Sequence, residues 1–343
     1  MKTTLTISVL TTTALLASCG PTKPSGKIEE ARAFKQVTLP VNVAPTLVPI
    51  DEAFQQQATN QIALAFNSSD PVIKAQALEA MSRTRDPAAS DRIQRAMTDK
   101  DWIVRFAGAM CAGDLKLKNT YKTIAAAAFD QDPNVRVAVR YALHRLGDKS
   151  LSKDLEALSL NSNENVRANV AFALGLLGEP TGTRILQPMI ADPNFNVRMQ
   201  TAEALWRLGD EQGLKNLIAA SVSKFTDDQI VAVLAMAGPR DQRVKPYVMA
   251  KFANDHDKKQ FVELQLVAAR ALGMLGDDSG FGLAVRTCVS TDPRQRSLAA
   301  LALGDIGRSD AQDALSRLLH DTAPGVQLSA ATALRLLGNR NRP

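Results

Sequence analysis

One segment recurs through most of this chain, and the copies around its centre are 31 residues apart. The copy "DPNVRVAVRYALHRLGD" (132–148) follows "DWIVRFAGAMCAGDLK" and precedes "NENVRANVAFALGLLGE" and "NFNVRMQTAEALWRLGD". Related copies are "DPVIKAQALEAMSRTRD", "FVELQLVAARALGMLGD", "DPRQRSLAALALGDIGR" and "APGVQLSAATALRLLGN". A fixed period of this size predicts a solenoid, in which each unit buries its apolar face only against its neighbours.

Each period contains two helical patterns. One reads V-R-x-x-A-A-x-A-L-G-x-L-G, with apolar residues on a 3.6-residue period, and the other lies between copies, as in "AQDALSRLLHD". The first pattern follows residues that accept the free N–H groups of a helix start, namely Asp70, Asp101, Asp132, Asn163, Asn194 and Asp292. It closes on glycines suited to a left-handed turn, namely Gly147, Gly178, Gly209, Gly276, Gly307 and Gly338. The sequence therefore predicts an all-α fold.

This pattern resembles HEAT-like repeats, particularly the short variety named after phycobilisome lyases. The resemblance covers residues 51–338 and implies an α-solenoid of about nine helix pairs, with a short tail at 339–343. The pair near 210–245 is degenerate and slightly long, which predicts a kink in the superhelix. The resemblance also implies that the V-R helices line a concave surface and that the array works by binding.

A basic residue occupies the same place in most V-R helices: Lys74, Arg105, Arg136, Arg167, Arg198 and Arg296. In HEAT-like repeats this residue typically joins a ladder of polar contacts with the Asp and Asn turns. Because it is present in most units, we interpret it as serving the stack of repeats rather than a ligand.

Arg140 and His144 depart from the repeat. Arg140 replaces an Ala of the sibling copies, and His144 replaces a Gly in four of them. Two interpretations are open. The pair belongs to a partner-binding site, because functional sites are where a consistent pattern is broken. Alternatively, a neighbouring loop makes room and both side chains extend to water.

A second candidate surface follows from large residues at one fixed place in consecutive helices. Met110, Tyr141 and Phe172 are 31 residues apart and lie on the face that the family resemblance makes concave. One turn further along are Arg145, Leu176 and Arg207. Apolar groups rimmed by Arg predict a groove for a peptide or helix of a partner. The alternative is that adjacent helices cover these side chains, which then only enlarge the core.

The N-terminus, "MKTTLTISVLTTTALLASCG", predicts a secretory signal, because it has an early cation and an apolar stretch too short to span a membrane. Residues 16–19, Leu-Ala-Ser-Cys, resemble the lipobox of bacterial lipoproteins, which implies a signal at 1–18 and a lipid on Cys19. Gly20 then implies the outer membrane if the cell has two membranes. Residues 19–50 contain prolines at 21, 24, 40, 45 and 49, which predict an extended tether.

The sequence gives little sign of catalysis. It contains no GxGxxG, GxSxG or HExxH motif, and its basic residues form no long run that indicates nucleic-acid binding. A HEAT-repeat enzyme, deoxyhypusine hydroxylase, resembles this architecture and holds iron with His-Glu pairs. None of His144, His256 and His320 is followed by Glu. Cys111 and Cys288 are expected to be buried thiols. No cofactor or metal is expected.

These observations favour a non-enzymatic, lipid-anchored scaffold that holds another envelope protein or peptide on its concave face. Two alternatives remain open at this stage. One is a HEAT-repeat enzyme of the hydroxylase or bilin-lyase type, and the other is a purely structural envelope spacer.

Overall fold

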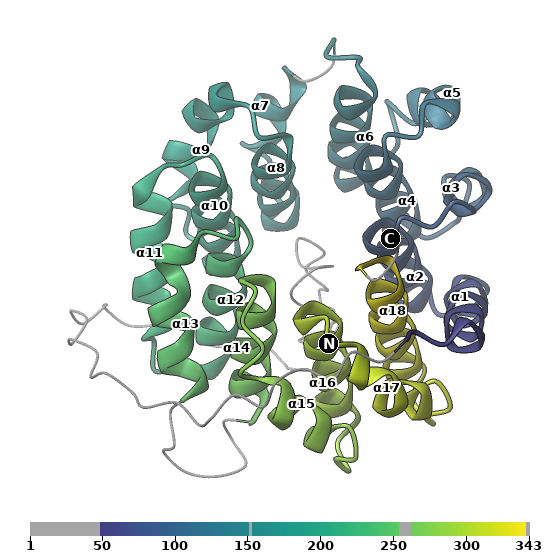
Figure 1. The fold of residues 1–343 in the computed structure, drawn as a ribbon. Helices are drawn as coiled ribbons and strands as arrows, with labels where there is room; N and C mark the ends of the chain where they lie inside the picture. Colours follow the sequence, from purple (N-terminus) through teal and green to yellow (C-terminus); the bar gives the residue numbers. More distant parts are fainter. Residues whose placement is uncertain (1–48, 151–152, 254–261, 341–343) are drawn as a thin grey trace. The chain divides into compact units, whose positions relative to one another are not determined.

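The computed structural model describes residues 49–150, 153–253 and 262–340, and all regular structure in these residues is helical (Figure 1). The expected alternation of helices is present. The longer helices are α1 (Glu52–Phe66), α2 (Pro71–Thr84), α4 (Trp102–Leu115), α6 (Pro133–Leu146), α8 (Glu164–Leu177), α10 (Phe195–Arg207), α12 (Thr226–Ala237), α14 (Val262–Met274), α16 (Pro293–Ile306) and α18 (Pro324–Arg340). Between them lie α3 (Ala89–Ala96), α5 (Tyr121–Ala126), α7 (Asp154–Leu158), α9 (Thr183–Met189), α11 (Glu211–Ser221), α13 (Lys245–Phe252), α15 (Phe281–Thr287) and α17 (Gln312–Leu318). The chain is an all-α solenoid of paired helices, as the repeat predicts.

The described residues divide into two compact units. Unit 1 comprises residues 66–216, and unit 2 comprises residues 217–340 together with residues 49–65. The division at 216 falls inside α11, in the repeat that the sequence marks as degenerate. The signal and most of the tether, residues 1–48, and the last three residues lie outside the described part of the chain.

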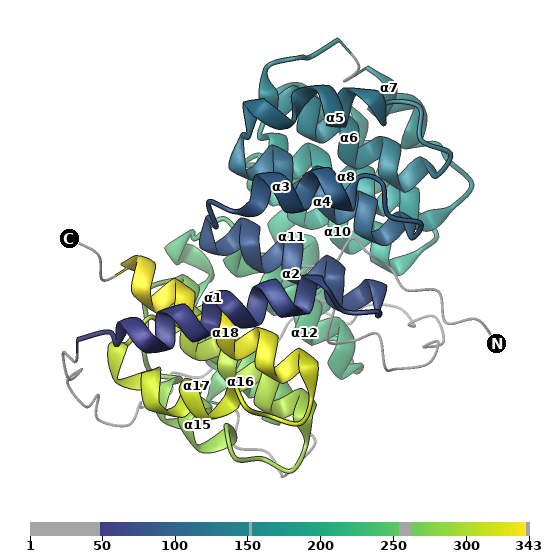
Figure 2. The same ribbon diagram turned by 90° about the vertical axis from the view of Figure 1, so that its right-hand side faces the viewer.

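Unit 1 consists of two layers of helices. The even-numbered helices α2, α4, α6, α8 and α10 pack side by side in chain order, and we call them the long-helix layer. The short helices α3, α5, α7 and α9 each pack against the long helix that follows them (Figures 1 and 2). The core lies between the layers and is built mainly from Ala, Val and Leu.

Helix starts and close approaches follow the repeat. The side chains of Asp70, Asp132, Asn163, Asn194 and Asp292 accept backbone N–H bonds from the first turn, as expected. Asp101 is the exception, because its side chain makes no such bond. Gly175 lets α8 approach α10 closely, since a Cβ added there would lie 2.8 Å from the Cα of Ala204.

Unit 2 repeats this arrangement with α12, α14, α16 and α18, and it also contains the helix that begins the array. α1 runs beside α18 (Figure 2), and the Gln55 side-chain amide donates to the backbone carbonyl of Leu334 at 2.6 Å. The buried Gln312 side chain accepts from the Asp51 N–H and donates to the Pro49 carbonyl. The first helix therefore contributes to the last repeat.

Gly338 does not end its helix, contrary to the repeat pattern. It lies inside α18, which continues to Arg340 and has no positive φ at this position. The reason is local: Gly338 packs directly against the Gln55 side chain of α1, so its small size serves close packing rather than a left-handed turn.

We expect Gly175→Ala to destabilise the protein by about 1–3 kcal/mol, because the added Cβ would collide with the Cα and Cβ atoms of Ala204 in α10. The matched control is Gly325→Ala in α18, where an added Cβ meets nothing within 4 Å. That change should be neutral or stabilising by up to about 1 kcal/mol, as for Ala over Gly in a helix. Urea denaturation followed by circular dichroism measures both. Equal stability of the two variants would contradict the close-approach argument.

Candidate functional site

The basic residue of the repeat pairs with an aspartate in the turn of the next repeat. The pairs are Lys74–Asp99 at 2.8 Å, Arg105–Asp130 at 2.7 Å, Arg167–Asp192 at 2.7 Å and Arg296–Asp321 at 2.6 Å. Each acid stands 25 residues after its base. We call each base, together with the turn residue 25 positions later, a rung of the ladder. These four rungs are complete ion pairs.

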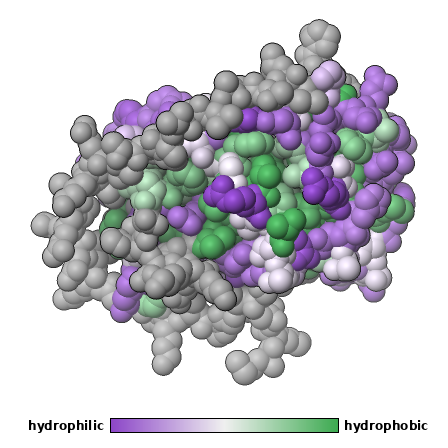
Figure 3. Space-filling model, turned by 60° about the horizontal axis from the view of Figure 1, so that its bottom comes forward, coloured by the Kyte–Doolittle hydropathy of each residue, from purple (hydrophilic) through white to green (hydrophobic). Residues whose placement is uncertain are grey.

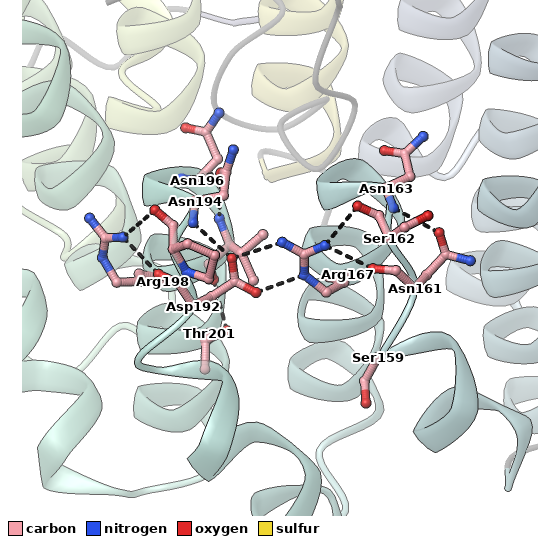
Figure 4. Close-up of polar contacts among 12 residues, drawn as sticks. Ser159, Asn161, Ser162, Asn163, Arg167, Asp192, Asn194, Asn196, Arg198 and Thr201 are labelled. Carbon is pink, nitrogen blue, oxygen red and sulfur yellow. Dashed lines mark hydrogen bonds and ion pairs between the residues drawn. The ribbon is translucent and has the colours of Figure 1, made fainter. Parts of the chain in front are cut away.

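Arg167 shows how one rung works (Figure 4). Its Nη1 donates to the carbonyls of Asn161 and Ser162 in its own turn, at 2.8 and 3.1 Å. Its Nε and Nη2 donate to the two oxygens of Asp192, at 2.7 and 2.9 Å. The same Asp192 accepts the backbone N–H of Asn194. One guanidinium therefore fixes two turns relative to each other.

The environment of the ladder sets the pKa of its acids. Burial by itself would raise the pKa of Asp192, but the bonds from Arg167 and the Asn194 N–H, with the nearby Arg198 charge, outweigh burial and hold the pKa below its usual range. Asp99 and Asp130 behave in the same way. For Asp321 the Arg296 bond is the largest influence, and its pKa is also lowered. The four carboxylates are therefore more stable in the charged form than in an unfolded chain.

Two rungs lack the acid. Arg136 and Arg198 keep the bonds to their own turns, with Nη1 at 2.7 Å from the carbonyls of Asp130 and Asp192. At the place of the next acid stand Asn161 and Ser223. Within the described residues, neither arginine forms an ion pair with a carboxylate.

Arg140 and His144 are buried and paired, so both sequence-based interpretations of them are corrected. Arg140 donates to the Asp154 carboxylate at 2.7 Å and to the Ala128 carbonyl at 3.1 Å. The His144 Nε2 lies 3.0 Å from the Glu179 carboxylate. Neither side chain extends into water or is accessible to a partner, because Asp154 of α7 pairs with Arg140 and Glu179, in the turn after α8, pairs with His144.

The proposed apolar stripe is mostly covered. Tyr141 is 1% exposed and Met110 is 7% exposed, so the expectation that they line an open groove is wrong for these two residues. Tyr141 can be buried because residue 113 is a glycine: a Cβ added to Gly113 would lie 2.7 Å from the Tyr141 ring. The Tyr141 hydroxyl donates to Asp114, and burial together with the Asp114 charge raises the Tyr141 pKa.

The accessible part of the stripe is a small patch centred on α8. Phe172 and Leu176 are half-buried and lie one helical turn apart on the same face. The half-buried Arg145 of α6 and Arg207 of α10 hold the corresponding place on the neighbouring helices. We call these four residues the α8 patch. In space-filling view, hydrophobic residues form small groups between hydrophilic ones on the face shown (Figure 3).

The charges of the α8 patch are partly compensated. Arg207 donates to Glu203 one turn earlier, at 2.7 Å. Arg145 acts electrostatically on Asp114, which also accepts a bond from Ser82. The surrounding protein displaces water around the Asp114 carboxylate and raises its pKa, while these partners lower it. The patch therefore combines two apolar side chains with arginines whose counter-charges lie beside them.

No cluster of three His, Cys, Asp or Glu residues in the described part of the chain could hold a metal ion. Burial raises the pKa of both thiols, that of Cys288 to about 11 and that of Cys111 further, so neither is activated as a nucleophile. No described helix has the length and apolar character needed to span a membrane.

The comparison with known families agrees with the ladder and the paired helices. A family model for HEAT repeats matches residues 61–143, 155–237 and 250–335, which is most of the chain. The chain belongs to the HEAT-repeat family. Among curated proteins none matches its sequence.

Solved structures with a similar course of helices include two enzymes. The complex of CpcE and CpcF of phycocyanin lyase from Nostoc is 18% identical over 77% of this chain and 97% of that chain, with a TM-score of 0.43. Human deoxyhypusine hydroxylase is 17% identical over 84% of this chain and 98% of that chain, with a TM-score of 0.35. Neither likeness bears on the activity of this HEAT-repeat protein.

Sequence reasoning missed the acids of the ladder. Asp99, Asp130 and Asp192 were not singled out, although each stands two residues before the Asp or Asn that directly precedes a long helix. This D-x-[DN] pattern, 25 residues after the basic residue, is the signal that identifies them. The 25-residue spacing joins a residue of one HEAT repeat to a residue of the next, so it is not visible when each copy is compared by itself.

We expect Arg167→Gln to lower the free energy of unfolding by about 1–3 kcal/mol near neutral pH, because Asp192 loses its charged partner. The folded pKa of Asp192 is lowered, so its stabilisation is fully present above the unfolded pKa of about 3.9 and is lost as pH falls through the folded value. The cost of the substitution should therefore shrink towards about pH 2.

Urea denaturation at several pH values measures this dependence. The control is Arg286→Gln, the same substitution at an exposed residue of α15 for which no ion pair is observed in the described chain. A constant difference between Arg167→Gln and wild type across the acid range would show that Asp192 is not stabilised by this rung.

Proposed function

We propose that this HEAT-repeat protein is a non-enzymatic scaffold of the bacterial cell envelope that holds a partner protein or peptide on the α8 patch. The observation that carries the proposal is the accessible apolar pair Phe172 and Leu176 between Arg145 and Arg207 on the long-helix layer. Solenoids bind extended partners along such layers. Aromatic residues and arginine are the types that dominate binding energy at protein interfaces.

The spacing of the patch fits a helical or extended segment of the partner. Phe172 and Leu176 lie one turn apart, so a partner with apolar residues spaced by one turn can pack on both. Arg145 is half-buried and acts on Asp114 through its charge without forming an ion pair with it, so it can bind a carboxylate of the partner instead. The partner we propose is therefore an amphipathic segment with apolar and acidic residues.

The membrane anchor is the second part of the proposal. It rests on the resemblance of Leu16 to Cys19 to a lipobox, in a part of the chain outside the described residues. A lipid on Cys19 and the Pro-rich residues 19–50 would hold the repeats at the membrane, on the periplasmic side of the outer membrane in a cell with two membranes.

For the partner site, we expect Phe172→Ala/Leu176→Ala to reduce recovery of one envelope protein by at least about tenfold in crosslinked affinity capture, the loss typical of a hot-spot pair. The control is Val289→Ala, which shortens an 80% exposed side chain elsewhere. Circular dichroism and thermal unfolding must first show that both variants are folded. If every captured protein is recovered equally, the patch binds nothing, and a purely structural spacer becomes the better proposal.

For the anchor, globomycin, which blocks cleavage of lipoprotein signals, should raise the apparent mass of the protein by about the mass of the signal. Cys19→Ser should release the repeats from the membrane fraction. Unchanged size and unchanged membrane attachment under both treatments would exclude lipidation at Cys19. Stoichiometric iron or a covalent chromophore in the purified protein would instead support an enzyme of the hydroxylase or lyase type.

A further inference from the structure

The complete arginine rungs use the guanidinium in two separate ways. In Arg105, Nη1 donates to the Asp99 and Lys100 carbonyls of its own turn, at 3.0 and 3.1 Å. Its Nε and Nη2 form a fork that donates to both oxygens of Asp130, at 2.7 and 2.8 Å. The bonds to the turn hold the guanidinium in place, and the fork then fits a planar carboxylate with two parallel bonds.

Arg136 has the first set of bonds and not the second. Its Nη1 donates to the carbonyls of Asp130 and Gln131, at 2.7 and 3.4 Å, as in the other rungs. No carboxylate of the described residues pairs with its Nε or Nη2, and Arg136 itself is only half-buried. The fork of Arg136 is therefore oriented by the fold and open to a ligand.

Asn161 explains why the chain does not fill this fork itself. It stands where the other rungs have Asp, and its Oδ1 accepts the Asn163 N–H at 2.9 Å, as Asp192 accepts the Asn194 N–H. In Figure 4 its side chain points away from Arg167, as Asp192 points away from Arg198. The other terminal atom of Asn161 is an NH₂ donor, so the side chain lacks the second acceptor oxygen and the negative charge that a fork of N–H donors requires. No hydrogen bond between Asn161 and Arg136 is observed in the described residues.

A second observation places apolar surface on the same two turns. Phe129 precedes Asp130 and is 85% exposed, and Leu160 precedes Asn161 and is 83% exposed. They are the most exposed large apolar side chains in the described part of unit 1. Arg136 donates to the first of these turns, and the second carries the asparagine that replaces its acid.

We propose that the Arg136 fork, together with Phe129 and Leu160 on the same two turns, is a receptor for a carboxylate of a partner polypeptide that is preceded by apolar residues. The complete rungs show the binding mode, with the carboxylate of the partner taking the place that Asp130 takes at Arg105. The apolar residues of the partner cover Phe129 and Leu160. This site is separate from the α8 patch and does not depend on it.

The surrounding charges favour a carboxylate over a phosphate. Asp130 is already paired with Arg105, but Asp132 in the turn to which Arg136 is bonded and Glu164 at the start of the next long helix form no ion pair among the described residues. A dianionic phosphate would be repelled by these acids more strongly than a singly charged carboxylate. The partner is therefore recognised by one carboxylate and its apolar neighbours.

Binding can be followed at Arg136 itself. The probes are acetyl-Leu-Leu, which ends in a free carboxylate, acetyl-Leu-Leu-Glu-amide, which offers a side-chain carboxylate, and acetyl-Leu-Leu-amide, which has none. Titration of the ¹⁵N-labelled protein should shift the Nε–H signal of Arg136, assigned with Arg136→Lys. We expect one or both acidic peptides to bind at least about tenfold more tightly than the amide, the difference typical of a charged hydrogen bond. Comparison of the two acids shows whether a terminal or a side-chain carboxylate is preferred.

Asn161→Asp is the decisive variant. It restores the missing acid, so Arg136 should pair internally, the melting temperature should rise, and binding of the acidic peptides should fall about tenfold. Because the variant gains stability, loss of binding cannot be attributed to unfolding. Phe172→Ala/Leu176→Ala should bind the peptides like wild type, which separates this site from the α8 patch. The proposal is overturned if no peptide shifts Arg136, if the amide binds as well as the acids, or if Asn161→Asp binds like wild type.

Discussion

The bidentate pair between a guanidinium and the aspartate of the following turn is the interaction on which the repeat structure depends. In a solenoid each helix pair contacts only its neighbours, so small residues such as Gly175 permit close packing but do not fix how one turn sits on the next. Arg167 does, because it binds the carbonyls of its own turn and the carboxylate of Asp192 at the same time. The mutual charge also lowers the pKa of the acid, so each rung is stable over the neutral range.

The junction between α6 and α8 departs from this rule in a coordinated way. Asn161 removes the acid from the Arg136 rung, and the same helix carries Arg140 and His144 where other copies have Ala and Gly. These two side chains form the links that the rung does not: Arg140 reaches Asp154, and His144 reaches Glu179. The neighbouring repeats therefore remain linked by polar side-chain contacts, although these contacts are not those of the ladder. Arg136 is left with an oriented and unfilled fork.

Much of the fold could be predicted because its determinants are local. The caps at Asp132 and Asn163, the left-handed turn at Gly147 and the apolar period of each helix are all readable within one copy. The candidate site was harder to predict, because exposure depends on neighbouring copies. Tyr141 and Phe172 occupy the same place in the repeat, yet Gly113 lets the Tyr141 ring pack closely, and Phe172 stays half-buried.

The sequence by itself therefore determined the HEAT-repeat class, the alternation of long and short helices and most of the residues that begin and end the long helices, since these follow from a period that the copies share. Only the tertiary structure decided which polar side chains have a carboxylate partner within the chain and which remain accessible to a ligand. Arg140, His144 and Arg136 are polar residues of one helix, but Asp154 pairs with Arg140 and Glu179 with His144, whereas Asn161 makes no bond to Arg136. The contact between α1 and α18 is also visible only in the tertiary structure, because contacts between distant parts of a chain leave no periodic signal in its sequence.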